Sequence, residues 1–315
     1  SRYVSSEIDV IYERLRCIIE QIVNNIEENV FHLDILSNTE RDLIVTQFNS
    51  TIWDYPRDKT VIQLFDEQAL ICEDKIAVSY GEHSITYGKL KRKVDALAGR
   101  LQMNGVQAGD YIAIMTKKSI EMIIGMCAIL KVGGVYVPID LKNPNSRIQC
   151  ILDDSKPKLV LKYRSNVETD IPVIDLERNE LWQEEAIEDV PYSADSIAYV
   201  MFTSGTTGKP KGSLITNRGI VRLVKNTNYI DLNADTVILQ TGSTAFDAAT
   251  FEIWGALLNG GKLVLADEKI VLNPEKLKAA INNNGVNTMW LTAALYNQII
   301  QIENTTFDAL STLLV

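Results

Sequence analysis

The sequence predicts an α/β protein in which layered, mostly parallel sheets are flanked by helices. From Lys75 onward, short apolar runs alternate with segments of helical periodicity, which is the order of repeated βα units. The 315 residues are 46% apolar, which is enough for a large core in one or two domains. A polar, glycine-rich segment directly follows one apolar run, and parallel sheets bind ligands at the carboxyl ends of their strands. We therefore expect a ligand-binding α/β fold.

The first 30 residues predict an amphipathic helix, because their apolar residues recur at helical spacing. These residues are Ile8, Ile11, Leu15, Ile18, Ile19, Ile22, Val23 and Ile26. One helix cannot bury its own apolar face, so it must pack on the body that follows or on a partner that precedes it. The capping-box pattern from Ser37 to Glu40 predicts a second, short helix, and polar residues 49–59 predict a linker.

Residues 75–161 predict a hairpin followed by alternating helices and strands. Thr86 can cap a helix that Gly105 ends. The predicted elements are, in order, hairpin strands Ile76–Tyr80 and Ser84–Tyr87, a helix from Thr86, a strand at Tyr111–Met115, a helix near Ser119–Lys131, a strand at Val135–Pro138, a helix near Arg147 and a strand at Leu159–Leu161.

Residues 166–196 are acidic and predict an irregular surface excursion, after which apolar strands return. Pro274 can begin one of the later helices, and Thr292 can cap another. The predicted strands are Ile197–Phe202, Val237–Leu239, Leu263–Leu265 and Val286–Leu291.

The segment after Phe202 combines hydroxyls, glycines and lysines, and predicts an anion site. Glycines let backbone N–H groups turn toward an anion, hydroxyls add donors, and lysines add charge suited to phosphate oxygens. A mobile surface loop is the alternative, but the density of donors favours phosphate binding. Pro210 after Lys209 excludes a P-loop of the GxxxxGK[S/T] type. The candidate residues are Thr203, Ser204, Gly205, Thr206, Thr207, Gly208, Lys209 and Lys211.

Composition excludes several classes of protein. The net charge of −10 argues against a nucleic-acid partner. The longest apolar run, residues 122–130, is too short to span a bilayer, and the N-terminus does not have the pattern of a secretory signal. The four cysteines show no CxxC pairing and the two histidines no cluster, so neither a metal site nor a disulfide framework is predicted. A reduced, cytoplasmic setting fits best.

The order Thr-Ser-Gly-Thr-Thr-Gly-Lys-Pro-Lys-Gly at 203–212 resembles the phosphate loop of the adenylate-forming superfamily, most closely that of adenylation domains in nonribosomal peptide synthetases. Residues 85–90 resemble the first core motif, with Lys89 in place of the usual Glu, and residues 130–140 resemble the second. Gly133 and Gly134 of the second motif are expected to serve packing and a tight turn. Residues 1–50 resemble the end of a condensation domain and its linker, so residues 51–315 would be part of an adenylation domain.

The resemblance implies activation of an amino acid with MgATP, giving aminoacyl-AMP and pyrophosphate. The acyl group would then pass to the phosphopantetheine thiol of a downstream carrier domain, in the synthesis of a peptide such as an antibiotic. Residues 203–211 would hold the β- and γ-phosphates. Because no protein nucleophile is required, the resemblance assigns no catalytic residue to this chain; the family's catalytic Lys has no counterpart in it.

The same resemblance assigns Asp247, which follows Phe246, to the α-ammonium group of the substrate. From spacing alone, Asp247 is more readily an N-cap of the next helix. Ala248, Phe251 and Trp290 would line the side-chain pocket, and Asp-Ala-Phe-Trp is similar to the opening of a valine-type signature; core packing is an equal alternative for the two aromatics. Relatives that activate fatty or aryl acids do not need this carboxylate, so Asp247 argues against an acyl-CoA ligase.

Besides Lys89, the chain departs from the pattern at three places. Ser213 stands where Val is common, and Asn217 where His is usual, which keeps hydrogen bonding but not aromatic stacking. Residues 310–315 match the strand before the Gly-Gly-Glu turn, so the adenine-binding segment and the C-terminal subdomain would lie outside the chain. We therefore expect little ATP–pyrophosphate exchange from these residues alone. A catalytically inactive module that docks through residues 1–50 is the alternative.

Overall fold

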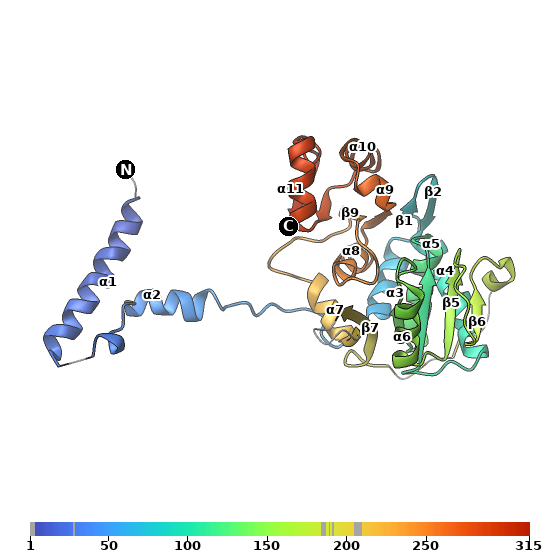
Figure 1. Ribbon diagram of the computed structural model, residues 1–315, viewed down its shortest axis with the longest axis horizontal. Coiled ribbons are helices and arrows are strands. Elements are labelled where there is room, and N and C mark those ends of the chain that lie inside the picture. The colour runs from blue at the N-terminus through green and yellow to red at the C-terminus, as the bar shows by residue number, and fades with distance from the viewer. Residues whose placement is uncertain (1–3, 28, 184–186, 189, 191, 205–209) are drawn as a thin grey trace. The chain divides into compact units, whose positions relative to one another are not determined.

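A computed structural model describes residues 4–27, 29–183, 187–188, 190, 192–204 and 210–315. The chain divides into two compact units, Ser1–Trp53 and Asp54–Val315. Figure 1 labels helices and strands of both units.

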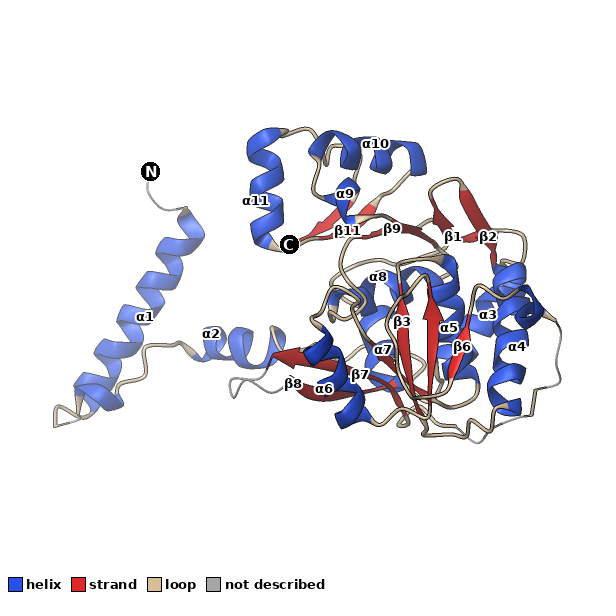
Figure 2. Ribbon diagram, turned by 45° about the vertical axis from the view of Figure 1, so that its right-hand side comes forward, coloured by secondary structure: helices blue, strands red, loops and turns tan. Residues whose placement is uncertain are grey.

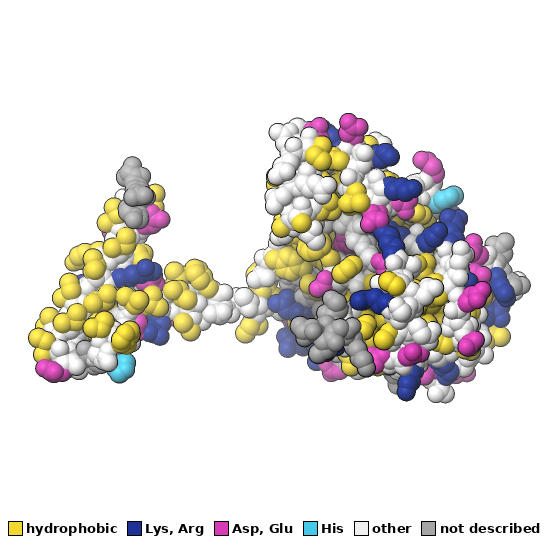
Figure 3. Space-filling model, viewed as in Figure 1, with side chains coloured by type: hydrophobic (Ala, Val, Ile, Leu, Met, Phe, Trp, Pro, Cys, Tyr) yellow, Lys and Arg dark blue, Asp and Glu magenta, His cyan; other side chains and the backbone are white. Residues whose placement is uncertain are grey.

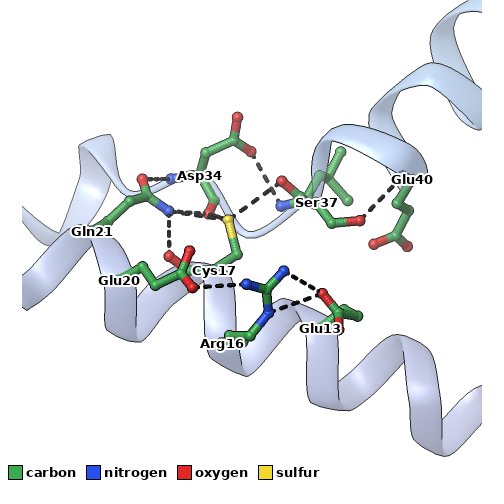
Figure 4. A network of polar contacts seen from close by, with 9 residues as sticks. Glu13, Arg16, Cys17, Glu20, Gln21, Asp34, Ser37 and Glu40 are labelled. Atoms are coloured by element: carbon green, nitrogen blue, oxygen red, sulfur yellow. Dashed lines mark hydrogen bonds and ion pairs between the residues drawn. The ribbon is translucent and has the colours of Figure 1, made fainter.

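The N-terminal unit is a long helix followed by short helical segments. Its elements are α1 (Ser5–Asn24), η1 (Val30–His32), α2 (Asn38–Asp42) and the π-helical turn η2 (Leu43–Gln47). Gln21 ties α1 to the segment before α2, because its amide donates to the Asp34 carbonyl at 2.6 Å and accepts from the Asp34 N–H at 2.9 Å (Figure 4). Ser37 caps α2 by accepting from the Glu40 N–H. The Glu40 carboxylate accepts a bond from Arg14, so only the Ser37 half of the predicted capping box forms.

The apolar stripe of α1 is exposed within this unit. The predicted helix is confirmed, yet none of its residues is buried. Figure 3 shows hydrophobic side chains over much of the visible face of the unit. The exposed large apolar residues of α1 include Ile8, Ile11, Leu15, Ile19, Ile22 and Val23.

The described strands of Asp54–Val315 form two six-stranded sheets, which we call sheets A and B. Sheet A has the order β12-β11-β9-β10-β1-β2 and sheet B the order β6-β5-β3-β4-β7-β8. In each, only the last strand runs antiparallel to its neighbour. Sheet A consists of β1 (Ile76–Tyr80), β2 (His83–Thr86), β9 (Val237–Gln240), β10 (Lys262–Leu265), β11 (Thr288–Trp290) and β12 (Thr312–Leu314). Sheet B consists of β3 (Tyr111–Thr116), β4 (Val135–Pro138), β5 (Leu159–Tyr163), β6 (Val173–Asp175), β7 (Ile197–Ser204) and β8 (Pro210–Thr216).

Helices pack between the sheets and on both outer faces (Figure 2). The middle layer contains α3 (Val61–Ile71), α4 (Tyr87–Met103), α5 (Ile120–Lys131) and α8 (Ala248–Leu257), with α7 (Asn217–Val224) against α8. Its apolar side chains and those of both sheets make the largest core cluster. A second cluster lies between sheet B and α6 (Asn145–Ser155), and a third between sheet A and α10 (Pro274–Asn284) and α11 (Ala293–Ile302). The predicted layered α/β architecture is confirmed.

Several elements were not predicted. Helix α3 was not predicted from the sequence, although five of its eleven residues are buried. Strand β8 is polar and largely exposed, and it forms because it pairs antiparallel with β7. The excursion predicted as irregular contains β6 and the short η3 (Asn179–Trp182), and α9 (Glu268–Val271) follows β10.

The two glycines of the second motif, Gly133 and Gly134, serve packing. Gly133 has φ of +70°, and a Cβ on Gly134 would lie 2.8 Å from the Ile112 Cδ1 atom, so larger residues would not fit without movement.

Asn217 is fully buried at the start of α7. Its side chain accepts from the Val61 N–H at 3.1 Å and donates to the Ser196 carbonyl at 2.9 Å. Asn217 therefore joins α3 to the segment before β7.

Replacing Asn217 should test this junction. Asn217→Ala leaves the N–H of the buried Val61 without its acceptor and removes one of the two bonds to the Ser196 carbonyl, and we expect it to lower the free energy of unfolding by about 2 kcal/mol. Urea unfolding measures the loss. Asn282→Ala, an exposed asparagine inside α10, is the matched control and should change stability little. Equal effects of the two variants would contradict the assignment.

Candidate functional site

The predicted phosphate segment begins within strand β7 and ends within strand β8. Strand β7 continues two residues beyond the predicted end at Phe202, and Thr203 pairs with Lys211 across the hairpin. Both residues are exposed, so a hydroxyl and an ammonium group lie on neighbouring strands at the hairpin end. The predicted residues Gly205, Thr206, Thr207, Gly208 and Lys209 lie outside the described residues.

Asp247 immediately precedes α8 and is exposed. It does not cap α8 as Thr292 caps α11, where the hydroxyl accepts from the N–H three residues on. The Asp247 backbone is already helical, and its carboxylate accepts from the adjacent Ala248 N–H at 2.9 Å. This carboxylate therefore keeps acceptor capacity toward solvent.

The first turn of α8 contacts the strand that leads to the hairpin. The hydroxyls of Thr250 and Tyr199 lie 2.6 Å apart in the interior. Burial raises the pKa of the Tyr199 phenol, and the nearby negative charge of Asp247 adds to the shift. From Tyr199 to Ser204 the strand extends about 16 Å at the usual rise per residue. The proposed ammonium-binding group and the proposed phosphate-binding segment thus flank one short stretch of β7.

The predicted pocket residues differ in exposure. Phe251 is buried, with its ring centroid 6.4 Å from that of Tyr229. Phe246 is 65% exposed, whereas Ala248 and Trp290 are half-buried. Phe251 therefore packs in the core as the alternative interpretation allowed, and Trp290 lies at the carboxyl end of β11 with part of its surface accessible.

The sequence matches a known protein family. The family model described as AMP-binding enzyme matches residues 65–314.

The chain belongs to the AMP-binding enzyme family.

This AMP-binding enzyme is similar in sequence and structure to synthetase proteins. The chain is 40% identical over 295 residues to bacitracin synthase 1 of Bacillus licheniformis, covering 92% of the chain and 6% of that protein. It therefore spans a small part of that relative's length. Among solved structures, holo-PA1221, a synthetase protein with adenylation and PCP domains bound to a vinylsulfonamide inhibitor, matches with a TM-score of 0.76 and 32% identity over 82% of this chain and 45% of that chain.

A second solved structure is itself an N-terminal subdomain. The Klebsiella oxytoca NpsA N-terminal subdomain in complex with 3-hydroxyanthranilyl-AMSN matches with a TM-score of 0.74 and 30% identity, covering 81% of this chain and 65% of that chain. The chain thus corresponds to the N-terminal part of an adenylation domain.

The sequence reasoning missed a buried polar cluster beside the Asp247 loop of this AMP-binding enzyme. The fully buried Glu252 accepts at Oε1 from the N–H and the hydroxyl of Thr241, both at 2.8 Å. The Lys118 ammonium donates to the carbonyls of Gln240 at 3.1 Å and Thr241 at 3.4 Å. Glu252 had a visible signal, because it is the one charged residue in α8, whose other residues apart from Thr250 are apolar or glycine.

The cluster has unusual acid–base properties. Burial raises the pKa of Glu252 to about 7, although bonds from Thr241 and the charge of Lys118 oppose the shift. Burial also lowers the pKa of Lys118 to about 8, against the attraction of Glu252. Both groups can therefore change charge near neutral pH.

Other candidate features lie elsewhere. A cavity of about 520 Å³ lies at the carboxyl ends of β3 and β5, lined in part by Lys117, Asn145, Arg164 and Glu168, and none of the predicted site residues borders it. Across the described residues, no group of three or more His, Cys, Asp or Glu side chains could hold a metal ion, and the four cysteines are free. No described helix has the length and apolarity needed to cross a membrane.

The raised pKa of Glu252 predicts a pH-dependent stability. Between about pH 4.5 and 7 the folded state holds a proton that the unfolded state has released, so stability falls as pH rises through this window. Relative to that of Glu252→Gln, the free energy of unfolding of wild type should fall by on the order of 3 kcal/mol across this pH window.

Urea unfolding at pH 5 and pH 7.5 measures the difference between the two proteins. Glu275→Gln, on the exposed first turn of α10, is the control and should follow wild type. A constant difference between wild type and Glu252→Gln at both pH values would refute the assignment.

Proposed function

We propose that this chain is the amino-acid- and phosphate-binding part of an enzyme that joins an amino acid to AMP, releasing pyrophosphate from MgATP. The observation that carries the proposal is the bond between Tyr199 and Thr250. It holds the first turn of α8, next to the exposed Asp247 carboxylate, against the strand that ends in the donor-rich hairpin. A carboxylate for an ammonium group and donors for phosphate oxygens are the two recognition elements that this reaction needs.

In this proposal the hairpin binds the phosphates of ATP. Residues 203–209 and Lys211 supply hydroxyls, backbone N–H groups and ammonium charge to the β- and γ-phosphate oxygens. These donors stabilise the negative charge that builds on pyrophosphate as it leaves. Bound Mg²⁺ would neutralise phosphate charge, and we assign no residue of the chain to it. The substrate carboxylate attacks the α-phosphorus, so the protein contributes position and electrostatics.

The amino acid lies at the start of α8 in this proposal. Asp247 accepts from its α-ammonium group, a charge-assisted bond that is stronger than a neutral one. Phe246, Ala248 and Trp290 border its side chain, and the buried Phe251 supports this pocket from the core; their apolar character suits valine or a similar branched residue. One methylene changes binding by only about 1–3 kcal/mol, so isoleucine and leucine would be activated at lower efficiency.

The relatives suggest the partners. The PCP domain that follows the adenylation domain in the name of PA1221 supports transfer of the aminoacyl group to a phosphopantetheine thiol on a downstream carrier domain. We assign the reaction to the cytoplasm. We assign the exposed apolar face of α1 to an upstream condensation domain, because that face needs an apolar cover. The same face favours the second candidate, a docking module without catalytic activity.

Lys211 tests the phosphate assignment. In the complete protein, Lys211→Ala should reduce kcat/KM for MgATP in amino-acid-dependent ATP–pyrophosphate exchange by about tenfold or more, since one charge-assisted bond is lost. Lys89→Ala removes another exposed lysine, in α4, and should leave exchange unchanged. An unchanged rate in Lys211→Ala would remove the assignment.

Asp247 tests the substrate class. Asp247→Ala should raise KM for valine by about ten- to a hundredfold, because an ammonium group loses its ionic partner, with KM for MgATP little changed. The same exchange assay measures both constants. Asp308→Ala, at an exposed position before β12, is the control. Equal increases in both KM values, or full activity in the variant, would count against an amino-acid substrate.

A further inference from the structure

The Thr241 hydroxyl faces two acceptors with a single proton. Its Oγ1 lies 2.8 Å from Glu252 Oε1 and 3.2 Å from the Trp290 carbonyl oxygen. A hydroxyl donates only one hydrogen bond at a time, so these two contacts compete. If the hydroxyl donates to Glu252, the end of β9 is bonded to α8; if it donates to the Trp290 carbonyl, the end of β9 is bonded to the end of β11.

Other bonds hold the backbone around Thr241 in place. Lys118 reaches from the loop after β3 to the carbonyls of Gln240 and Thr241. The Gln240 amide donates to the Gly242 carbonyl at 2.9 Å, and the Thr241 N–H donates to Glu252. The backbone of residues 240–242 is therefore fixed where the chain leaves β9 toward Asp247. The Thr241 hydroxyl, by contrast, can donate to either of its two acceptors.

The charge of Glu252 sets the balance between the two acceptors. A charge-assisted hydrogen bond is roughly twice as strong as a neutral one, so the carboxylate outcompetes the Trp290 carbonyl. A protonated Glu252 loses that advantage, and the hydroxyl proton becomes available to Trp290. The positive charge of Lys118 favours the ionised form of Glu252, and the charges of Asp267, Glu268 and Lys142 act in turn on Lys118.

We propose that Thr241 and Glu252 are positioning residues of the amino-acid site, in which the Thr241 hydroxyl couples the loop that carries Asp247 to the strand end that carries Trp290. This inference rests on the proposed function, because it gives Asp247 and Trp290 the ammonium and side-chain contacts. Neither positioning residue touches the substrate. They act by setting the distance between Asp247 and Trp290, the two residues that contact the substrate in this proposal.

The first test removes only the hydroxyl. Thr241→Val keeps the side-chain shape and the N–H bond to Glu252, and in the complete protein it should raise KM for valine about two- to tenfold, the loss of one neutral hydrogen bond. KM for MgATP should not change. Thr241→Ser retains the hydroxyl and should restore the wild-type KM for valine, a rescue that a general packing defect would not show.

The second test uses pH. KM for valine in wild type should rise as pH increases from 6 to 8 and Glu252 ionises, because the carboxylate then draws the Thr241 hydroxyl away from Trp290. Glu252→Gln cannot ionise and should give a KM that is flat over the same range. The ATP–pyrophosphate exchange assay provides both profiles.

The outcomes separate the two proposals. If wild type shows no exchange with any amino acid, the proposed function and this inference both fail. If wild type exchanges valine normally while Thr241→Val keeps its KM, or if Glu252→Gln retains the wild-type pH profile, the positioning role alone is overturned.

Discussion

The contact between Tyr199 and Thr250 is the constraint on which the arrangement of this protein depends. Tyr199 belongs to sheet B, whereas Thr250 belongs to α8, which packs on β9 and β10 of sheet A. The Tyr136 ring stacks on Tyr199 with centroids 5.1 Å apart, and the Trp254 indole N–H donates to the Tyr136 hydroxyl. Buried hydroxyls need partners, so this cluster fixes how α8 meets β7. The position of Asp247 relative to the hairpin follows from that fixed contact.

The local pattern of the sequence was enough to predict the order of elements and several of their ends. Thr86, Asn273 before Pro274, and Thr292 each begin helices with side-chain oxygens that accept backbone N–H groups, as local chemistry requires. The division of the strands between two sheets could not be read in the same way, because pairing joins residues such as Val78 and Leu263 that are far apart in the chain. Strand β8 was missed for a different reason, because it is largely exposed and lacks an apolar run, and it forms by pairing with the neighbouring strand β7.

The candidate site was predictable in part. Its exposed groups, Asp247 and Lys211, stand in motifs and could be named from the sequence alone. The supporting groups Lys118, Thr241 and Glu252 could not, since their roles depend on burial and on contacts between α8, β9 and the loop after β3. A charged residue inside an apolar helix is nevertheless a usable signal, because burial of an ionisable group requires polar partners.

The central claim is that Asp247 and the β7–β8 hairpin belong to one site. A crystal structure of the complete protein with valine and a non-hydrolysable ATP analogue would test it most directly. We predict the valine ammonium group within hydrogen-bond distance of the Asp247 carboxylate and the terminal phosphates against residues 203–211. Phosphates bound away from the hairpin, or an ammonium group with another partner, would contradict the account.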